Sequence, residues 1–194
     1  MRKKIIPEIP EIPELERELS RERYKRRYRR TLRSTIYALI TVAAVAILVA
    51  TLWLPVLEIY GSSMSPTLED GQIVLSLKTG EFKSGQIVAF YYNNKILVKR
   101  VIAQAGDWVN IDLDGNVYVN SERLDEPYLV DKAFGECDIE LPYQVPETHV
   151  FVMGDHRSTS VDSRNTAVGC VTNDQIVGRL VLCLYPFSDF GVIE

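Results

Sequence analysis

The sequence is poor in the residues that usually hold metals or build disulfide scaffolds. Its 194 residues include three cysteines and two histidines, and no two cysteines are spaced as Cys-x-x-Cys. No pair of His or Cys residues has the spacing of zinc ligands, and three cysteines allow at most one intrachain disulfide. We therefore expect neither a metal nor an organic cofactor.

Several nucleophile and phosphate motifs are also absent. The chain lacks Gly-x-Ser-x-Gly, Ser-x-x-Lys and a phosphate-binding glycine loop. These absences argue against an α/β-hydrolase, a penicillin-recognising enzyme and a nucleotide-binding protein. A disordered chain is excluded because 46% of the residues are hydrophobic.

Charge is strongly segregated along the chain. Residues 1–35 carry a net charge of +6, residues 36–57 carry none, and residues 58–194 carry −10. The only basic segment adjoins an apolar run, which argues against nucleic acid as a partner.

The apolar run Ile36–Leu57 contains 22 residues and no ionisable side chain. As a helix it would be about 33 Å long, enough to cross a hydrocarbon core of about 30 Å. The alternatives are a buried core helix and a cleavable signal peptide, whose apolar core has only about 7–15 residues. We interpret the run as a transmembrane anchor in a lipid bilayer.

The flanks of this run predict its orientation. Arg21–Arg33 contains eight basic residues, and such a cluster stays in the cytoplasm. The prediction is a cytoplasmic basic tail (1–35), a transmembrane signal-anchor helix (36–57) and an extracytoplasmic domain (58–194). Within the tail, the Ile-Pro-Glu repeat of Ile6–Glu14 predicts an extended segment.

The extracytoplasmic domain has the pattern of a mainly β protein. Apolar, β-branched stretches are separated by turn signals, and Asp114-Gly115 between two alternating stretches is typical of a hairpin. We expect a hairpin-built β-barrel or sandwich, preceded by a single N-terminal transmembrane helix. The expected strands are Ile73–Leu77, Ile87–Tyr92, Ile96–Ala103, Trp108–Leu113, Val117–Val119, Val150–Met153 and Ile176–Leu184.

Two short segments of this domain contain candidate catalytic residues. Ser63 lies in a serine-rich turn before a proline, and Lys99 lies in an apolar strand on the face of Leu97 and Val101. Burial would lower the lysine pKa from about 10.4 towards 7–8, which leaves a neutral amine able to deprotonate a serine. The alternatives are an ordinary turn and a lysine that reaches solvent from an edge strand.

Four ordered segments resemble the conserved boxes of one enzyme family. They are Ser63–Leu68, Gly85–Phe90, Lys99–Asp107 and Gly154–Arg164, and Asp125–Tyr128 fits as well. The chain thereby resembles the bacterial type I signal peptidases of the small Gram-positive kind, which are Ser–Lys proteases of family S26. The resemblance covers most of the predicted extracytoplasmic domain.

The resemblance implies a role for each matching residue. Ser63 would be the nucleophile, its backbone N–H would stabilise the oxyanion, and Lys99 would be the general base. Ser160 would hydrogen-bond the lysine amine and orient it. The residues that would support the last segment are Asp162 and Arg164 as an ion pair, together with Asp155 and Arg157.

The same resemblance implies a substrate and a place. Exported preproteins would lose their N-terminal signal peptides after a small-x-small site such as Ala-x-Ala. The cleavage would occur on the extracytoplasmic face of the plasma membrane, near the secretion translocon. An extended substrate would pair with a strand edge. Ile73–Leu75 and Ile87–Ala89 are candidate pocket residues, of which we expect at least half to belong to the core.

Two positions depart from the family pattern. Gly61 stands where some members have a serine that acts as a second oxyanion donor, and His156 stands where the family usually has Asn. We expect His156 to support its loop, although it leaves open a Ser–His variant of the mechanism. His149 is expected to be structural.

Three other functions are compatible with parts of the pattern. Self-cleaving stress-response repressors share the Ser–Lys chemistry and the fold, but they carry a DNA-binding domain and no membrane span. An anchored β domain that binds peptides or cell-wall material would keep its function after replacement of Ser63 or Lys99. A degenerate peptidase kept as a scaffold is the third, but both expected catalytic residues are present.

Overall fold

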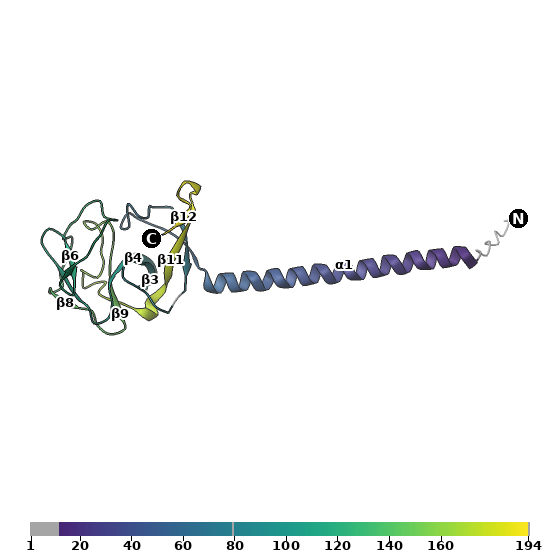
Figure 1. Ribbon diagram of the computed structural model, residues 1–194, viewed down its shortest axis with the longest axis horizontal. Helices are drawn as coiled ribbons and strands as arrows, with labels where there is room; N and C mark the ends of the chain where they lie inside the picture. Colours follow the sequence, from purple (N-terminus) through teal and green to yellow (C-terminus); the bar gives the residue numbers. More distant parts are fainter. Residues whose placement is uncertain (1–11, 79, 194) are drawn as a thin grey trace. The chain divides into compact units, whose positions relative to one another are not determined.

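The computed structural model describes residues 12–78 and 80–193 (Figure 1). The chain divides into two compact units between Ala50 and Thr51. The first unit is helical and the second carries the strands. Each is described by itself.

The helix α1 (Ile12–Trp53) is 42 residues long. Its apolar part has a mean hydropathy of 2.4, and none of that part is buried. Among the described residues, α1 is the one helix long and apolar enough to cross a membrane, so it is compatible with a membrane anchor. Of the Ile-Pro-Glu repeat, residues 6–11 lie outside the described residues. Residues 12–14 are helical rather than extended as predicted.

The helix ends earlier than the sequence pattern predicts. Its last residue is Trp53, whereas the predicted span continues to Leu57. Pro55 accounts for the difference, because a proline pushes the preceding residue out of the helical region and offers no N–H of its own. Beyond it, Val56–Glu58 forms the first strand, β1, of the second unit.

The second unit consists of antiparallel strands in two sheets. The larger sheet has the order β1-β2-β11-β3-β4-β9-β10 with β12 beside β11, and the smaller has the order β7-β6-β5-β8. The predicted mainly β fold is therefore confirmed. The remaining elements are β2 (Ile73–Leu77), β3 (Ile87–Tyr92), β4 (Lys95–Ala103), β5 (Trp108–Ile111), β6 (Val117–Val119), β7 (Glu122–Arg123), β8 (Tyr143–Gln144), β9 (His149–Met153), β10 (Val171–Thr172), η1 (Asn173–Gln175), β11 (Ile176–Tyr185), η2 (Phe187–Asp189) and β12 (Gly191–Val192).

All seven predicted strands are present, with ends that shift by at most two residues. The five strands that were not predicted, β1, β7, β8, β10 and β12, have only two or three residues each. Such short stretches cannot display the alternation by which a strand is recognised. The expected hairpin at Gly115 joins β5 to β6.

The two sheets do not close into one barrel within the described residues, because β1 and β10 are the ends of the larger sheet. One apolar cluster joins the sheets instead. It contains residues of β4 and β9 from the larger sheet and of β5 and β6 from the smaller one: Ile102, Ala103, Phe151, Met153, Val109, Ile111 and Val117. This packing fixes β4 and β9, which lead into the site described below.

The β5–β6 hairpin provides a test of the packing. Gly115 has φ +79°, and a Cβ there would lie 2.6 Å from the backbone of Ala133. Gly106 has φ +86° with nothing within 4 Å, so it is a matched control. We expect Gly106→Ala to lower the free energy of unfolding by about 1–2 kcal/mol, and Gly115→Ala to lower it clearly more. Urea unfolding of the full chain in detergent measures both, and equal losses would contradict the close approach of Ala133.

Candidate active site

Ser63 and Lys99 come from distant parts of the chain and meet in the second unit. Ser63 lies in the loop between β1 and β2 (residues 59–72), which the buried side chains of Met64 and Leu68 anchor. We name it the nucleophile loop after the role expected of Ser63. Lys99 lies in β4. Its Nζ is 2.7 Å from Ser63 Oγ. This is the spacing of a serine nucleophile and an adjacent base.

The surroundings of Lys99 favour its neutral form. The residue is only 3% exposed. Burial lowers its pKa from 10.5 to about 8, although the carboxylates of Asp162 and Asp155 oppose this shift and Arg164 adds to it. Desolvation of the ammonium is therefore the dominant effect. A substantial fraction of the amine is neutral near pH 8 and can accept the serine proton.

A buried ion pair holds the loop from Gly154 to Arg164. Arg164 Nε and Asp162 Oδ1 are 2.8 Å apart, and both side chains are fully buried. Asp162 also accepts a hydrogen bond from the Gly154 N–H at 2.9 Å. Burial alone would raise the pKa of Asp162, but the Arg164 guanidinium and the Gly154 N–H hold it below its usual value. The ionised carboxylate thus ties the two ends of the loop together.

Ser160 lies beside the nucleophile loop, but it does not hydrogen-bond the Lys99 amine in the described structure. It is 2% exposed, and its hydroxyl lies close enough to Asp162 to help hold the pKa of that carboxyl below its usual value. A Cβ on Gly154 would collide with Ser160 Oγ and would lie 2.5 Å from the backbone oxygen of Ser63. Glycine at 154 therefore lets the loop approach Ser63 closely. The expected bond between Ser160 and Lys99 is not formed here, where the amine is directed at Ser63 Oγ instead.

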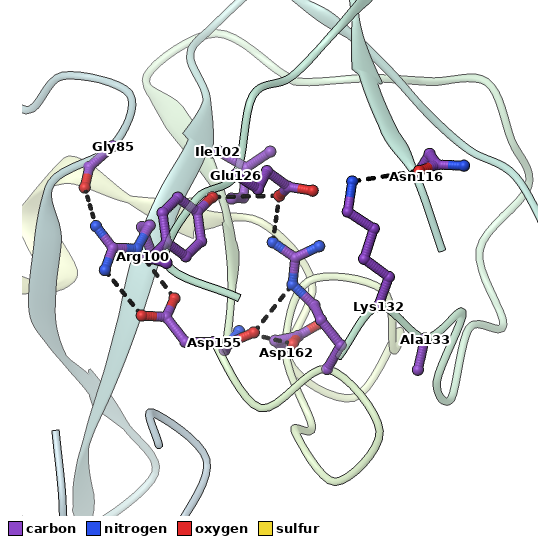
Figure 2. A network of polar contacts seen from close by, with 12 residues as sticks. Gly85, Arg100, Ile102, Asn116, Glu126, Lys132, Ala133, Asp155 and Asp162 are labelled. Carbon is purple, nitrogen blue, oxygen red and sulfur yellow. Dashed lines mark hydrogen bonds and ion pairs between the residues drawn. The ribbon is translucent and has the colours of Figure 1, made fainter. Parts of the chain in front are cut away.

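Arg100 follows Lys99 and binds three other segments. Its Nε and Nη2 donate to Asp155 at 3.0 and 2.8 Å, and its Nη1 donates to the Gly85 oxygen at 2.7 Å (Figure 2). Thr67 Oγ1 donates to the same carboxylate at 2.5 Å. Asp155 therefore links the lysine strand to the nucleophile loop. Arg100 and Thr67 were not predicted from the sequence, although alternation in β4 already put Arg100 on the face opposite Lys99.

The histidines occupy different settings. The His156 backbone N–H donates to the Ser63 oxygen at 3.1 Å, and its Nδ1 is 3.3 Å from the Ser62 oxygen. His156 therefore supports the nucleophile loop through these contacts. His149 begins β9, and its Nδ1 is 2.7 Å from the Glu147 oxygen.

A groove of about 710 Å³ opens beside Ser63. Its lining comes from β1, the nucleophile loop and the first half of β4: Leu57, Glu58, Ile59, Tyr60, Gly61, Ser63, Met64, Asn94, Lys95, Ile96, Leu97 and Val98. The pocket candidates Ile73–Leu75 and Ile87–Ala89 do not line it. Most of them are buried in the core, because Val74, Ile87 and Ala89 pack in one apolar cluster and Val88 packs in another.

The strand pairing leaves backbone free along this groove. From Lys95 to Lys99, β4 pairs with β3 on one side, whereas its pairing with β9 begins at Arg100. β1 is an end strand of the sheet. An extended peptide in the groove would therefore meet a strand edge with open hydrogen-bonding groups.

The potential metal ligands are scattered. Within residues 12–78 and 80–193, no three His, Cys, Asp or Glu side chains are grouped so that they could hold a metal ion. The three cysteines, Cys137, Cys170 and Cys183, are free thiols. Burial raises the pKa of Cys170 to about 11, so this thiol is a poor nucleophile near neutral pH.

The chain is similar to known proteins over most of its length. Residues 32–185 match the family described as signal peptidase, peptidase S26. The chain is 40% identical over 152 residues to signal peptidase IB of Staphylococcus aureus, which covers 68% of this chain and 78% of that protein. It is 35% identical over 165 residues to signal peptidase I of Bacillus licheniformis, with 78% and 88% covered. A crystal structure of a signal peptidase I from Enterococcus faecalis has a TM-score of 0.45 and 28% identity, covering 52% of this chain and 97% of that one.

The match to the family model extends from the apolar helix to the end of β11 and includes both Ser63 and Lys99. With identities of 35–40% to named members, the likeness extends well beyond the matched boxes. The protein belongs to the S26 signal peptidase family and is a serine peptidase.

Proposed function

We propose that this protein removes signal peptides from exported preproteins by hydrolysis after a small-x-small site such as Ala-x-Ala, with Ser63 as nucleophile and Lys99 as general base. The observation that carries the proposal is the 2.7 Å contact between Lys99 Nζ and Ser63 Oγ. Burial of the lysine, which lowers its pKa to about 8, supports the assignment. The signal peptidases among its relatives support the substrate class.

In the first half of the reaction, neutral Lys99 takes the proton of the Ser63 hydroxyl while Ser63 Oγ attacks the scissile carbonyl carbon. The negative charge on the carbonyl oxygen is stabilised by the Ser63 backbone N–H. The tetrahedral intermediate then collapses as the Lys99 ammonium donates its proton to the leaving amine. The mature chain departs, and the signal peptide remains as an ester on Ser63.

In the second half, Lys99 takes a proton from a water molecule that attacks the ester. Collapse of the new intermediate returns a proton to Ser63 Oγ and releases the signal peptide. Ser160 is the third member of the group: its buried hydroxyl accepts a hydrogen bond from the ammonium when Lys99 is protonated and orients it. Asp162, Arg164 and Asp155 hold this arrangement through buried ion pairs.

The substrate binds as an extended strand in the groove beside Ser63. Backbone hydrogen bonds to the open edge of β4 provide affinity that does not depend on side chains. The apolar lining contributed by Ile59, Met64 and Leu97 favours small uncharged side chains near the cleaved bond. This arrangement fits a small-x-small site, because alternate residues of a strand point to the same side.

The proposal also includes the cellular setting. The apolar part of α1 from residue 36 to residue 53 provides the anchor in the plasma membrane bilayer. Residues 1–35 remain in the cytoplasm, and the domain that begins with β1 acts on the extracytoplasmic side near the translocon. The eight basic residues of Arg21–Arg33 support this orientation.

Replacement of either central residue should abolish turnover. We expect Ser63→Ala and Lys99→Ala each to lower kcat by about a thousandfold or more, because the nucleophile and its base act as a unit. The measurement is release of the mature chain from a preprotein with an Ala-x-Ala site, using the full chain in detergent. Ser158→Ala and Lys83→Ala, at exposed positions, are the matched controls. Turnover by Lys99→Ala at the wild-type rate would exclude the lysine base and favour His156.

The pH dependence should follow the neutral fraction of Lys99. With a pKa of about 8, that fraction falls tenfold per pH unit on acidification, so kcat/KM should drop by about fiftyfold between pH 8 and pH 6. Above pH 9 the Lys99 amine is almost fully neutral, so its titration should no longer change the rate. Cleavage rates at low substrate concentration measure the profile, and a rate independent of pH over this range would contradict a neutral lysine base.

The same lowered pKa predicts a stability cost. The Lys99 pKa is lower in the folded chain than in the unfolded chain, so the unfolded chain binds the proton more tightly. This difference lowers the free energy of unfolding, and the full reduction is present below pH 8. We expect Lys99→Met to raise the free energy of unfolding at pH 7 by up to about 3 kcal/mol. The gain should disappear as pH approaches 10.5. Denaturant unfolding at pH 7 and pH 10 tests this, and a variant less stable at both would contradict it.

A further inference from the structure

A segment that begins within Asp125–Tyr128 and continues to residue 134 contacts the arginines of the site. Residues 126–134 lie between β7 and β8 and contain neither helix nor strand. We call this segment the arginine brace. It contacts Arg100, Arg157 and Arg164.

The strongest contact is a buried ion pair between Glu126 and Arg157. Arg157 Nη2 donates to Glu126 Oε1, and both side chains are fully buried. Arg157 Nε donates to the backbone oxygen of Gly154 at 3.1 Å. Glu126 Oε2 and Arg157 Nη1 have no partner within the described residues, so each charge is compensated chiefly by the other.

The other two arginines also meet the brace. Arg100 Cζ lies 3.9 Å from the centre of the Tyr128 ring, a cation–π contact. The Tyr128 hydroxyl donates to Glu126 Oε1 at 3.2 Å. Burial raises the pKa of Tyr128, so this hydroxyl remains a donor. Arg164 Nη1 donates to the backbone oxygen of Phe134 at 2.7 Å.

Each arginine therefore joins the brace to the loop beside Ser63. Arg157 reaches that loop through the Gly154 oxygen, and Gly154 is packed so closely against the Ser63 backbone that it has no room for a Cβ. A displacement of Arg157 would shift Gly154, and with it the backbone contacts of the nucleophile.

We propose that Glu126 is a positioning residue: acting through Arg157, it holds the Gly154–Arg164 loop against Ser63 and so controls turnover. The inference rests on the proposed function, because turnover is the quantity that it affects. Glu126 does not line the substrate groove, so it should contribute to kcat rather than to substrate binding.

The test is the isosteric change Glu126→Gln in the full chain in detergent. We expect kcat per folded molecule to fall by about a hundredfold, as a misplacement of roughly 1 Å in a site can cause. KM should stay within about twofold of wild type, because the groove is untouched. Glu136→Gln, an exposed glutamate after the brace, should behave as wild type. Circular dichroism gives the folded fraction for each variant.

The double variant Glu126→Gln/Arg157→Met shows through which residue Glu126 acts. It leaves no uncompensated buried charge, so it should fold even if Glu126→Gln does not. Its kcat per folded molecule should equal that of Arg157→Met alone, because the proposal has Glu126 act through Arg157.

Several results would overturn the inference. They are a wild-type kcat in Glu126→Gln, a loss explained by the unfolded fraction, a rise in KM with kcat unchanged, and losses that add in the double variant. In each case wild type would still cleave and Ser63→Ala would not, so the proposed function would survive. Failure of wild type to cleave the preprotein would overturn both proposals.

Discussion

In the proposed mechanism, the chemistry of this peptidase depends on the burial of one amine next to one hydroxyl. Removing the Lys99 ammonium from water is unfavourable, and this desolvation outweighs the attraction of two nearby carboxylates. Asp162 would pull the lysine towards its charged form more strongly if Arg164 did not lie 2.8 Å away. Arg164 therefore has two effects: it shapes the loop, and its positive charge helps to keep the base neutral.

The buried charges around Ser63 and Lys99 form three pairs of opposite sign. Arg100, Arg157 and Arg164 are buried, and each forms an ion pair with Asp155, Glu126 or Asp162. Buried ion pairs of this kind contribute little net stability, because desolvation of the charges offsets their attraction. Arg100 and Arg164 each make two hydrogen bonds to their carboxylate, and Arg157 makes one. These directional bonds instead fix the positions of irregular segments. Three such segments meet here without a helix or strand to align them: the nucleophile loop, the brace and the Gly154–Arg164 loop.

Local patterns predicted the strands well because alternation and turn residues act over a few neighbours. The Asp114-Gly115 hairpin and the long strands are of this kind. The end of the helix was predicted too late, because the apolar run continues past Pro55 to Leu57 whereas the helix ends at Trp53. The contact between Ser63 and Lys99 joins residues far apart in sequence, so it was predicted only through the family resemblance. Of the six candidate pocket residues, four belong to the core, in line with the expectation for at least half of them. The groove is lined by other residues, because alternation shows that one face of a strand is apolar but not whether that face meets the core or a groove.

Direct titration of the Lys99 amine tests the central claim, that burial beside Ser63 produces a neutral base. The full chain can be prepared with lysine labelled at Cε and compared with Lys99→Met to assign the signal by NMR. We predict a midpoint at about 8 for this lysine, below the ordinary lysine value of about 10.4. A Lys99 midpoint near 10.4 in the folded protein would contradict the account, because the amine would then be charged at the pH where the enzyme works.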